Sequence, residues 1–558
     1  MYRVLSFILL LALAANHAVI AQKAPSWVKK SVKSVCSIIT YDASGAESGR
    51  AAGIFVSEDG QCVTDYKLLV GVDSVIVITH DGKQYPVCYV EGCDDIYDLA
   101  RMKVDVKSVS PIPFAEVPAK AGDKVYVIQY SRGKDYKYKS ATVTAVENAR
   151  DGDHFYTLSV REKFDDVRSC PVVNADGELL GIYQYGAKDT TAYACGVRMA
   201  MGLSFDAFMF QDVRAAAVRL LKKLPDNAND AQVALVMGRP SMTDDRYLDY
   251  LNIYKEQFPD VPYAYEQLAY YYAGRDADES VKCMEAAIAR YANKDEACYA
   301  KAKFIEAASD SLGDRKGYSL GDAYDDIRQA VGIDPQPLYY QLKGRIEWEF
   351  GDYASAIQSY KAVLGSNLCS VQAINEYLTV NELNGMSADS MVILIDTLQH
   401  RYSTALGADS VELLYAKALY LNNAGDFAKS LQSLMAYSAA HDEQMTADFY
   451  YFREQIALKA RRYQQAINDI GRALQLVPDD ISYRLEYAGL CIIIDNLDEA
   501  ISTLEQCRAM SPDNTDVNRL LGLALIQAGR KDEGRAYLIE ARESGDIAAG
   551  RLLEQYAE

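Results

Sequence analysis

The side chains best suited to metal chemistry lie close together in the first hundred residues. His80, Cys88 and Cys93 offer one imidazole and two thiols, the ligand types that Zn²⁺ prefers. Their spacing matches no compact zinc motif, and a fourth ligand is missing nearby. We therefore predict no metal site, and no other motif in the sequence indicates a cofactor.

A second segment, Arg132–Lys139, interleaves basic and aromatic residues, as nucleic-acid-binding segments often do. The same alternation is typical of an exposed β-hairpin, in which successive side chains point to opposite faces. We favour the hairpin and predict no nucleic-acid partner.

The elements around these residues are expected to be short strands separated by turns. Glu58-Asp59-Gly60 and Asp81-Gly82 are turn sequences that separate β-rich stretches. Strands at this spacing, without helical periodicity between them, indicate an all-β barrel or sandwich from Val32 to about Met201. The predicted strands include Ser37–Thr40, Ala52–Val56, Ser74–Ile78, Lys124–Ile128, Ala141–Val146 and Leu179–Tyr183.

Three blocks of this region occur in a fixed order, namely Gly53–Thr64, Tyr97–Lys103 and Pro171–Ile182. They resemble, in turn, the hairpin before the catalytic His, the segment around the catalytic Asp and the stretch after the catalytic Ser of Deg/HtrA-type trypsin-like serine peptidases. The resemblance implies a pair of six-stranded β-barrels with the active site between them.

Two of the three catalytic positions differ from that family. Where the family's first block ends on His, this chain continues through Thr64 and Asp65 to Lys67. The family's Ser position holds Arg168, and only the Asp position is kept, as Asp98. A Ser nucleophile needs a neighbouring base and an orienting carboxylate, and an Arg side chain cannot attack a carbonyl. The resemblance therefore implies a degenerate triad with no catalytic residue.

The loop that would hold the oxyanion differs as well. The family's glycine before the nucleophile corresponds to Asp166, and the two glycines after it correspond to Ser169 and Cys170. Those glycines let the backbone turn its amides toward the developing oxyanion. Asp165 and Asp166 are expected to place negative charge there instead.

Two further interpretations of these residues stay open. Ser169 or Cys170 could act as a displaced nucleophile with Lys67 as its base, since a Lys with a depressed pKa can serve in that role. Alternatively, Lys67, Asp98 and Arg168 could form a buried ion cluster in place of the triad. An unpaired charge between the barrels would be costly, which favours the cluster.

After the barrel region the sequence pattern becomes helical. Residues 204–224 are predicted to form a helical linker, which Pro225 ends. Residues 225–552 resemble tetratricopeptide repeats, most plainly in the last three units, which show a period of 34 with small residues where two helices would cross closely; the earlier units fit this period more loosely. The region has room for roughly nine units. The positions that carry the period are Ala466, Ala500 and Gly534, Ile470, Leu504 and Leu538, and Ala473, Cys507 and Ala541.

Charge separates the two regions. The net charge is −20, and Lys223–Glu558 account for all of it with 32 basic and 52 acidic residues, whereas Gln22–Lys222 is nearly neutral. Such a field repels nucleic-acid phosphates and anionic membrane surfaces. The repeat resemblance implies a groove that binds a protein or peptide, and the charge predicts a neutral or basic partner.

The N-terminus has the features of a signal peptide. Arg3 precedes the apolar run Leu5–Ala15, and Val19-Ile20-Ala21 predicts cleavage after Ala21, so that residues 1–21 are removed. The run is too short to span a bilayer, and we expect no membrane span. Export permits disulfides, but the 11 cysteines show no dense framework, and several lie in strand-like runs as small core residues.

Together these features predict a multidomain fold. It comprises an all-β trypsin-like double barrel over residues 25–203, the linker, and an all-α superhelical repeat solenoid. The predicted function is that of a periplasmic or secreted scaffold that combines a pseudoprotease domain with a protein-binding array. The alternative is an active trypsin-like serine endopeptidase with atypical catalytic residues, whose repeats bind substrates or partners.

Overall fold

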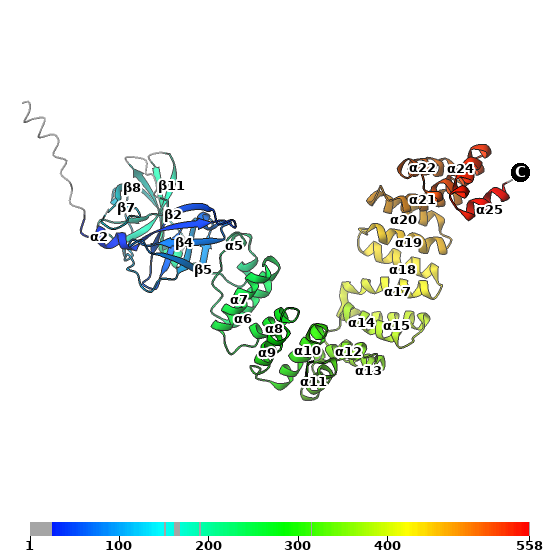
Figure 1. Ribbon diagram of the computed structural model, residues 1–558, viewed down its shortest axis with the longest axis horizontal. Coiled ribbons are helices and arrows are strands. Elements are labelled where there is room, and N and C mark those ends of the chain that lie inside the picture. Colours follow the sequence, from blue (N-terminus) through cyan, green and yellow to red (C-terminus); the bar gives the residue numbers. More distant parts are fainter. Residues whose placement is uncertain are drawn as a thin grey trace, which may run out of the picture. The chain divides into compact units, whose positions relative to one another are not determined.

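The computed structural model describes residues 25–134, 136–149, 152–160, 168–188, 191–313 and 315–556 (Figure 1). The predicted signal peptide and the residues Asp165 and Asp166 lie outside the described residues. The chain forms two compact units, Met1–Arg290 and Tyr291–Glu558.

Two closed, antiparallel barrels of six strands each form most of the first unit. The strand order is β1-β2-β3-β6-β5-β4 in the first barrel and β10-β11-β12-β9-β8-β7 in the second, so the predicted double barrel is confirmed. The first barrel contains β1 (Val35–Tyr41), β2 (Glu47–Phe55), β3 (Gln61–Thr64), β4 (Ser74–Ile78), β5 (Gln84–Asp94) and β6 (Leu99–Val104). The second contains β7 (Lys124–Ile128), β8 (Tyr138–Asn148), β9 (His154–Val160), β10 (Pro171–Val173), β11 (Leu179–Lys188) and β12 (Thr191–Gly196).

One apolar core cluster runs through both barrels. Val35, Ile54 and Leu99 of the first barrel and Val127 and Ile182 of the second are all fully buried in it. Burying a side chain of this size stabilises the fold by roughly 1.5–3 kcal/mol. All the cysteines are free thiols, and most of them are buried, in agreement with the core role expected of several. Short helices flank the strands, namely α2 (Val28–Ser31), η1 (Val32–Ser34), α3 (Tyr66–Leu69) and α4 (Arg198–Met201).

The helical linker predicted over residues 204–224 is wrong for most of its length. After two short helices the chain runs extended beside β5, where the Val90 N–H donates to the Leu221 carbonyl at 2.7 Å and the Lys223 N–H donates to the Val90 carbonyl at 2.8 Å. The Ala-rich stretch does form the short helix α5, but the residues after it pair with the open backbone groups of β5 instead of continuing the helix. The two short helices are η3 (Phe208–Gln211) and α5 (Val213–Ala217).

Helices follow one another in pairs through the rest of both units. Polar side chains begin many of them: Asp352 and Asp426, for example, accept N–H groups of the first turns of α13 and α18, and such caps stabilise a helix by about 1 kcal/mol. Gly351 and Gly425 adopt positive φ in the turns between paired helices, which glycine tolerates best. The first unit has α6 (Ala228–Gly238), η4 (Arg239–Ser241), α7 (Asp244–Gln257), α8 (Tyr263–Tyr272) and α9 (Ala277–Ile288).

Over its described residues, the second unit consists of helices and the turns that connect them. Its helices are α10 (Lys294–Leu312), α11 (Leu320–Ile333), α12 (Pro337–Glu349), α13 (Tyr353–Leu364), α14 (Val371–Leu383), α15 (Ala388–Arg401), α16 (Ser403–Leu406), η5 (Gly407–Glu412), α17 (Leu413–Asn423), α18 (Phe427–Ala440), α19 (Ala447–Lys459), α20 (Tyr463–Leu476), α21 (Ile481–Ile493), α22 (Leu497–Met510), α23 (Thr515–Gln527), α24 (Lys531–Glu543) and α25 (Ile547–Gln555). Within the described part of the chain, no helix is both long and apolar enough to cross a bilayer.

The positions that carry the 34-residue period lie in the second helices of the last pairs. Ala466, Ala500 and Gly534 belong to α20, α22 and α24 and are buried. A Cβ atom on Gly534 would lie only 2.5 Å from the carbonyl oxygen of Gly522 in α23. The period therefore marks the places where paired helices come closest, as the sequence predicts.

We predict that Gly534→Ala lowers the free energy of unfolding by about 1–3 kcal/mol, because the added methyl group forces α23 and α24 apart. Gly489→Ala is the matched control, since Gly489 also lies inside a helix, α21, but has open space around its Cβ position. That control should stabilise by up to about 1 kcal/mol through helix propensity alone. Urea unfolding, with hydrogen exchange over α23 to α25, measures both effects. Equal stability changes in the two variants would contradict the close crossing.

Candidate functional site

The three predicted triad positions lie on neighbouring segments of the two barrels. Lys67 is in α3, directly after β3, and Asp98 precedes β6. The Lys67 N–H donates to Asp98 Oδ1 at 2.9 Å. Arg168 precedes β10 of the second barrel, and its carbonyl accepts the N–H of Ala52 in β2 at 2.9 Å. The structure thus brings the three segments to the junction between the barrels.

Lys67 and Asp98 form an ion pair that is largely open to solvent. Lys67 Nζ lies 3.3 Å from Asp98 Oδ2, and the Lys67 side chain is 66% exposed. Water and salt screen such a pair, which stabilises a protein by about 0–1 kcal/mol. Asp98 itself has a φ of 52°, a left-handed conformation that Asp adopts more readily than most residues.

Arg168 pairs with a carboxylate that the sequence analysis did not single out. Its Nε atom donates to Asp65 Oδ2 at 2.9 Å, and the Asp65 side chain is only 5% exposed. Burial raises the pKa of Asp65 to about 6, against the opposing effects of Arg168 and the nearby Ser169 hydroxyl, while the charge of Asp98 adds to the rise. The loss of water around Asp65 therefore outweighs the attraction of its partner.

The predicted buried cluster of Lys67, Asp98 and Arg168 is wrong in its pairing. Lys67 and Asp98 do pair as expected, although Lys67 is largely exposed, but Arg168 binds Asp65 instead of Asp98. The reason is burial: Asp65 has lost more water than Asp98 and so has the greater need of a cation. In the sequence, the feature that could have identified Asp65 is its position, directly after a buried strand and two residues before Lys67.

Ser169 and Cys170, the candidate displaced nucleophiles, are both fully buried. Ser169 has a φ of 59°, and the Cys170 carbonyl accepts the N–H of Tyr183 at 2.8 Å. A residue with a Cβ atom pays roughly 1–2 kcal/mol in this left-handed conformation. A substrate carbonyl cannot reach either side chain unless this segment opens.

The candidate zinc ligands do not converge. Cys88 is exposed and Cys93 buried on β5, while His80 Nδ1 contacts the carbonyl of Ser131 at 2.6 Å. Over the described residues, no three or more His, Cys, Asp or Glu side chains group in a way that could hold a metal ion. Strands β7 and β8 pair in antiparallel fashion, and the basic and aromatic segment contributes Tyr138 and Lys139 to β8, so over the described residues the predicted hairpin is confirmed.

Comparison with protein families gives two matches along this chain. Residues 51–182 match the model of a trypsin-like peptidase domain, and residues 495–555 match a tetratricopeptide repeat. The first match covers the three blocks on which the resemblance to trypsin-like peptidases rests, and the second covers the region of the last repeat units.

Curated relatives are similar to about a quarter of the chain. The chain is 26% identical over 157 residues to a probable periplasmic DegP-like serine endoprotease of Halomonas elongata, covering 28% of this chain and 31% of that protein. A protein of the same description from Chlamydia muridarum is 22% identical over 165 residues, covering 28% and 31%. The chain thus spans about a third of the length of these relatives.

Solved structures resemble about a third of the chain. A protease of M. tuberculosis in its active form aligns with 20% identity and a TM-score of 0.28, covering 32% of this chain and 86% of that one. A serine endoprotease of Yersinia pestis aligns with 21% identity and a TM-score of 0.27, covering 31% and 62%.

We predict that Arg168→Met destabilises the protein in a pH-dependent manner. The folded pKa of Asp65 lies above its ordinary value of 3.8, so the folded state holds the extra proton between about pH 4 and 6, and this group's contribution to stability falls as pH rises through that window. Removing Arg168 raises the pKa of Asp65 in the folded state further, so the fall in stability continues to higher pH.

Near pH 7 we expect Arg168→Met to lower the free energy of unfolding by about 2 kcal/mol. This is less than for a fully buried pair, because Arg168 is 37% exposed. Near pH 4, where Asp65 is protonated with or without Arg168, the loss should be small. Chemical denaturation at both pH values measures it, with Lys67→Met as the control. A loss of equal size at the two pH values would contradict the role of Asp65.

Proposed function

We propose that this chain, which joins a trypsin-like peptidase domain to tetratricopeptide repeats, is an exported interaction protein whose peptidase domain does not cleave peptides. The observation that carries the proposal is Arg168. It stands at the position that corresponds to the family's nucleophile, and Asp65 holds its guanidinium at 2.9 Å. A guanidinium stays charged at all usable pH values and is no nucleophile.

The contacts around Arg168 give further support. A base must reach the nucleophile's proton, but Lys67 points its ammonium at Asp98 and is largely exposed. Ser169 and Cys170 are buried, which argues against the alternative of a displaced nucleophile. We further propose that the domain recognises a partner without turnover, and that the relatives' periplasmic location, together with the predicted signal peptide, extends to this protein.

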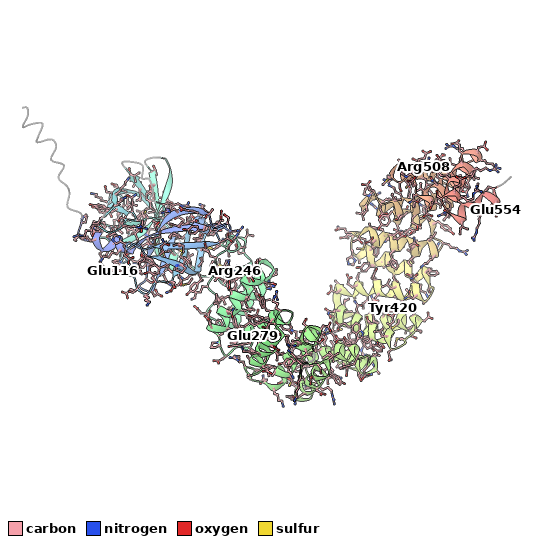
Figure 2. The ribbon with its side chains drawn as sticks, in the orientation of Figure 1. Glu116, Arg246, Glu279, Tyr420, Arg508 and Glu554 are labelled. Atoms are coloured by element: carbon pink, nitrogen blue, oxygen red, sulfur yellow. The ribbon has the colours of Figure 1, made fainter. Side chains whose placement is uncertain are left out.

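The repeats are the proposed partner-binding element. A groove of about 500 Å³ lies between α14 and α17, the first helices of consecutive pairs; Glu382, Glu412 and Tyr420 line it, and no Lys or Arg does. Glu382 accepts the Tyr420 hydroxyl at 2.7 Å and Glu412 accepts that of Tyr437 at 3.2 Å, so both carboxylates are held in place (Tyr420 is labelled in Figure 2). We call this the α14–α17 groove. Its acidic and aromatic lining favours a basic segment of a partner protein.

We predict that the purified protein turns over neither casein nor fluorogenic peptides. The double variant Arg168→Ser with Lys67→His should remain inactive, because Ser169 and Cys170 leave the oxyanion loop without its glycines. A Deg-type peptidase assayed in the same buffers is the positive control. Turnover that disappears in Ser169→Ala or Cys170→Ala would establish the alternative of an active enzyme, and rescue by the double variant would refute the loop argument.

We predict that the full-length protein binds a fluorescent Lys- and Arg-rich peptide, and that Glu382→Gln with Glu412→Gln weakens this binding about tenfold. Raising the salt concentration should weaken binding to the wild type more than to the double variant, because exposed charge pairs are screened. Fluorescence anisotropy measures both effects. Glu543→Gln with Glu554→Gln, two exposed residues of α24 and α25, is the charge-matched control. An equal effect of the two double variants would place binding outside the groove.

A further inference from the structure

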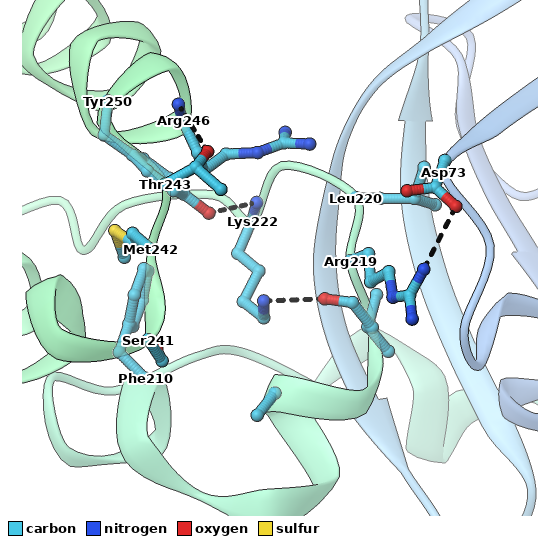
Figure 3. A pocket seen from close by; sticks show the side chains of 12 residues that line it. Asp73, Phe210, Arg219, Leu220, Lys222, Ser241, Met242, Thr243, Arg246 and Tyr250 are labelled. Carbon is cyan, nitrogen blue, oxygen red and sulfur yellow. Dashed lines mark hydrogen bonds and ion pairs between the residues drawn. The ribbon is translucent and has the colours of Figure 1, made fainter. Parts of the chain in front are cut away.

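A pocket of about 420 Å³ lies within the first unit, where the extended segment after α5 passes between the first barrel and the helices α6 and α7. Asp73 lines it from the barrel side, and Thr243, Arg246 and Tyr250 line it from α7 and its N-cap (Figure 3). Its volume falls in the range of small-molecule sites. The residues that form it are far apart in the sequence, so no sequence motif indicates the pocket.

Three cations and one carboxylate line this pocket. Arg219 and Asp73 compensate each other, since Arg219 Nη1 lies 3.3 Å from Asp73 Oδ2. Lys222 and Arg246 have no such partner: over the described residues, neither side chain makes an ion pair, and the Arg246 guanidinium makes no hydrogen bond. Figure 3 shows Lys222 at the centre of the lining side chains, between Arg246 and Arg219. The pocket therefore holds two uncompensated positive charges.

Lys222 is half-buried, which makes its charge costly without an anion nearby. Its Nζ atom donates to the Val218 carbonyl at 2.8 Å, which uses one of the three ammonium donors. Burial lowers the pKa of Lys222 to about 8, and the repulsion of Arg246 adds to this effect, while Cys93 opposes it. The two cations are thus close enough to repel each other, and an anion between them would offset this repulsion.

Hydroxyl groups complete the polar side of the pocket. The Tyr250 oxygen accepts the backbone N–H of Lys222 at 2.9 Å, and Thr243 Oγ accepts the backbone N–H of Arg246 at 3.3 Å. Each oxygen is occupied as an acceptor, which leaves its O–H to donate to a ligand. All four groups, two cations and two hydroxyls, are donors, the chemistry that binds a carboxylate or phosphate.

The opposite wall of the pocket is apolar, with Phe210, Leu220 and Met242 among its lining residues. We infer that this pocket binds a small organic anion, whose carboxylate or phosphate group lies between Lys222 and Arg246 and whose apolar body packs against Phe210. This ligand site is separate from the junction of the two barrels and from the α14–α17 groove.

Titration calorimetry of the full-length protein with phenyl phosphate and with benzoate tests the inference and distinguishes the two kinds of acidic group. We expect saturable binding of at least one of them and none of benzamide, which has the same ring without the charge. Lys222→Met and Arg246→Gln should each weaken binding by about tenfold or more, since each removes a charged donor. Lys223→Met is the matched control, because Lys223 pairs with Asp226 and does not line the pocket.

A second measurement does not depend on the variants folding. With a pKa near 8, Lys222 should be acetylated by acetic anhydride faster than exposed lysines are at neutral pH, and the binding anion should protect it. Peptide mass spectrometry reads this out residue by residue. The inference is overturned if neither anion binds saturably, if Lys223→Met weakens binding as much as Lys222→Met, or if a bound anion leaves the acetylation of Lys222 unchanged.

Discussion

A carboxylate that has lost its water must have a positive partner, and the junction between the two barrels is arranged around this requirement. Asp65 directly follows β3, in which Cys62, Val63 and Thr64 are buried, and Arg168 is the cation that pairs with it. The same residue also binds the first barrel through its backbone, by accepting the N–H of Ala52. A side chain that would have no place in peptide cleavage is thus built into the attachment of one barrel to the other. Restoring a nucleophile at this position would leave Asp65 buried without its cation.

The parts of the fold that depend on local sequence patterns could be predicted. Beta-rich stretches between turn sequences identified strands such as β1 and β11, and the 34-residue spacing of Ala466, Ala500 and Gly534 identified the helix crossings. The extended segment after α5 could not be predicted in this way. Its conformation depends on pairing with Val90 of β5, more than a hundred residues earlier in the chain.

The residues of the candidate site could likewise be predicted from the sequence only in part. Lys67, Asp98 and Arg168 could be predicted because each lies in or beside a block with a recognisable pattern, but the partner of Arg168 could not, since it depends on how much water each carboxylate has lost. Asp65 was not predicted as a site residue because its position does not correspond to a catalytic residue of the trypsin-like peptidases. The pocket around Lys222 and Arg246 was missed for a simpler reason: only the fold brings the barrel, the extended segment and α7 together.

The close approach of Gly522 and Gly534 also bears on how such an array changes its length during evolution. Ala466, Ala500 and Gly534 are buried at equivalent places in successive pairs, and Gly534 contacts Gly522 within its own pair, so the crossing inside a pair recurs with each unit. A duplication or deletion of one whole 34-residue unit therefore preserves the crossing in each remaining pair, whereas a change of a few residues within a helix rotates the small residues away from the crossing. Gene rearrangements in steps of one unit can lengthen or shorten this part of the protein while the barrels, and the Asp65–Arg168 ion pair between them, stay as they are.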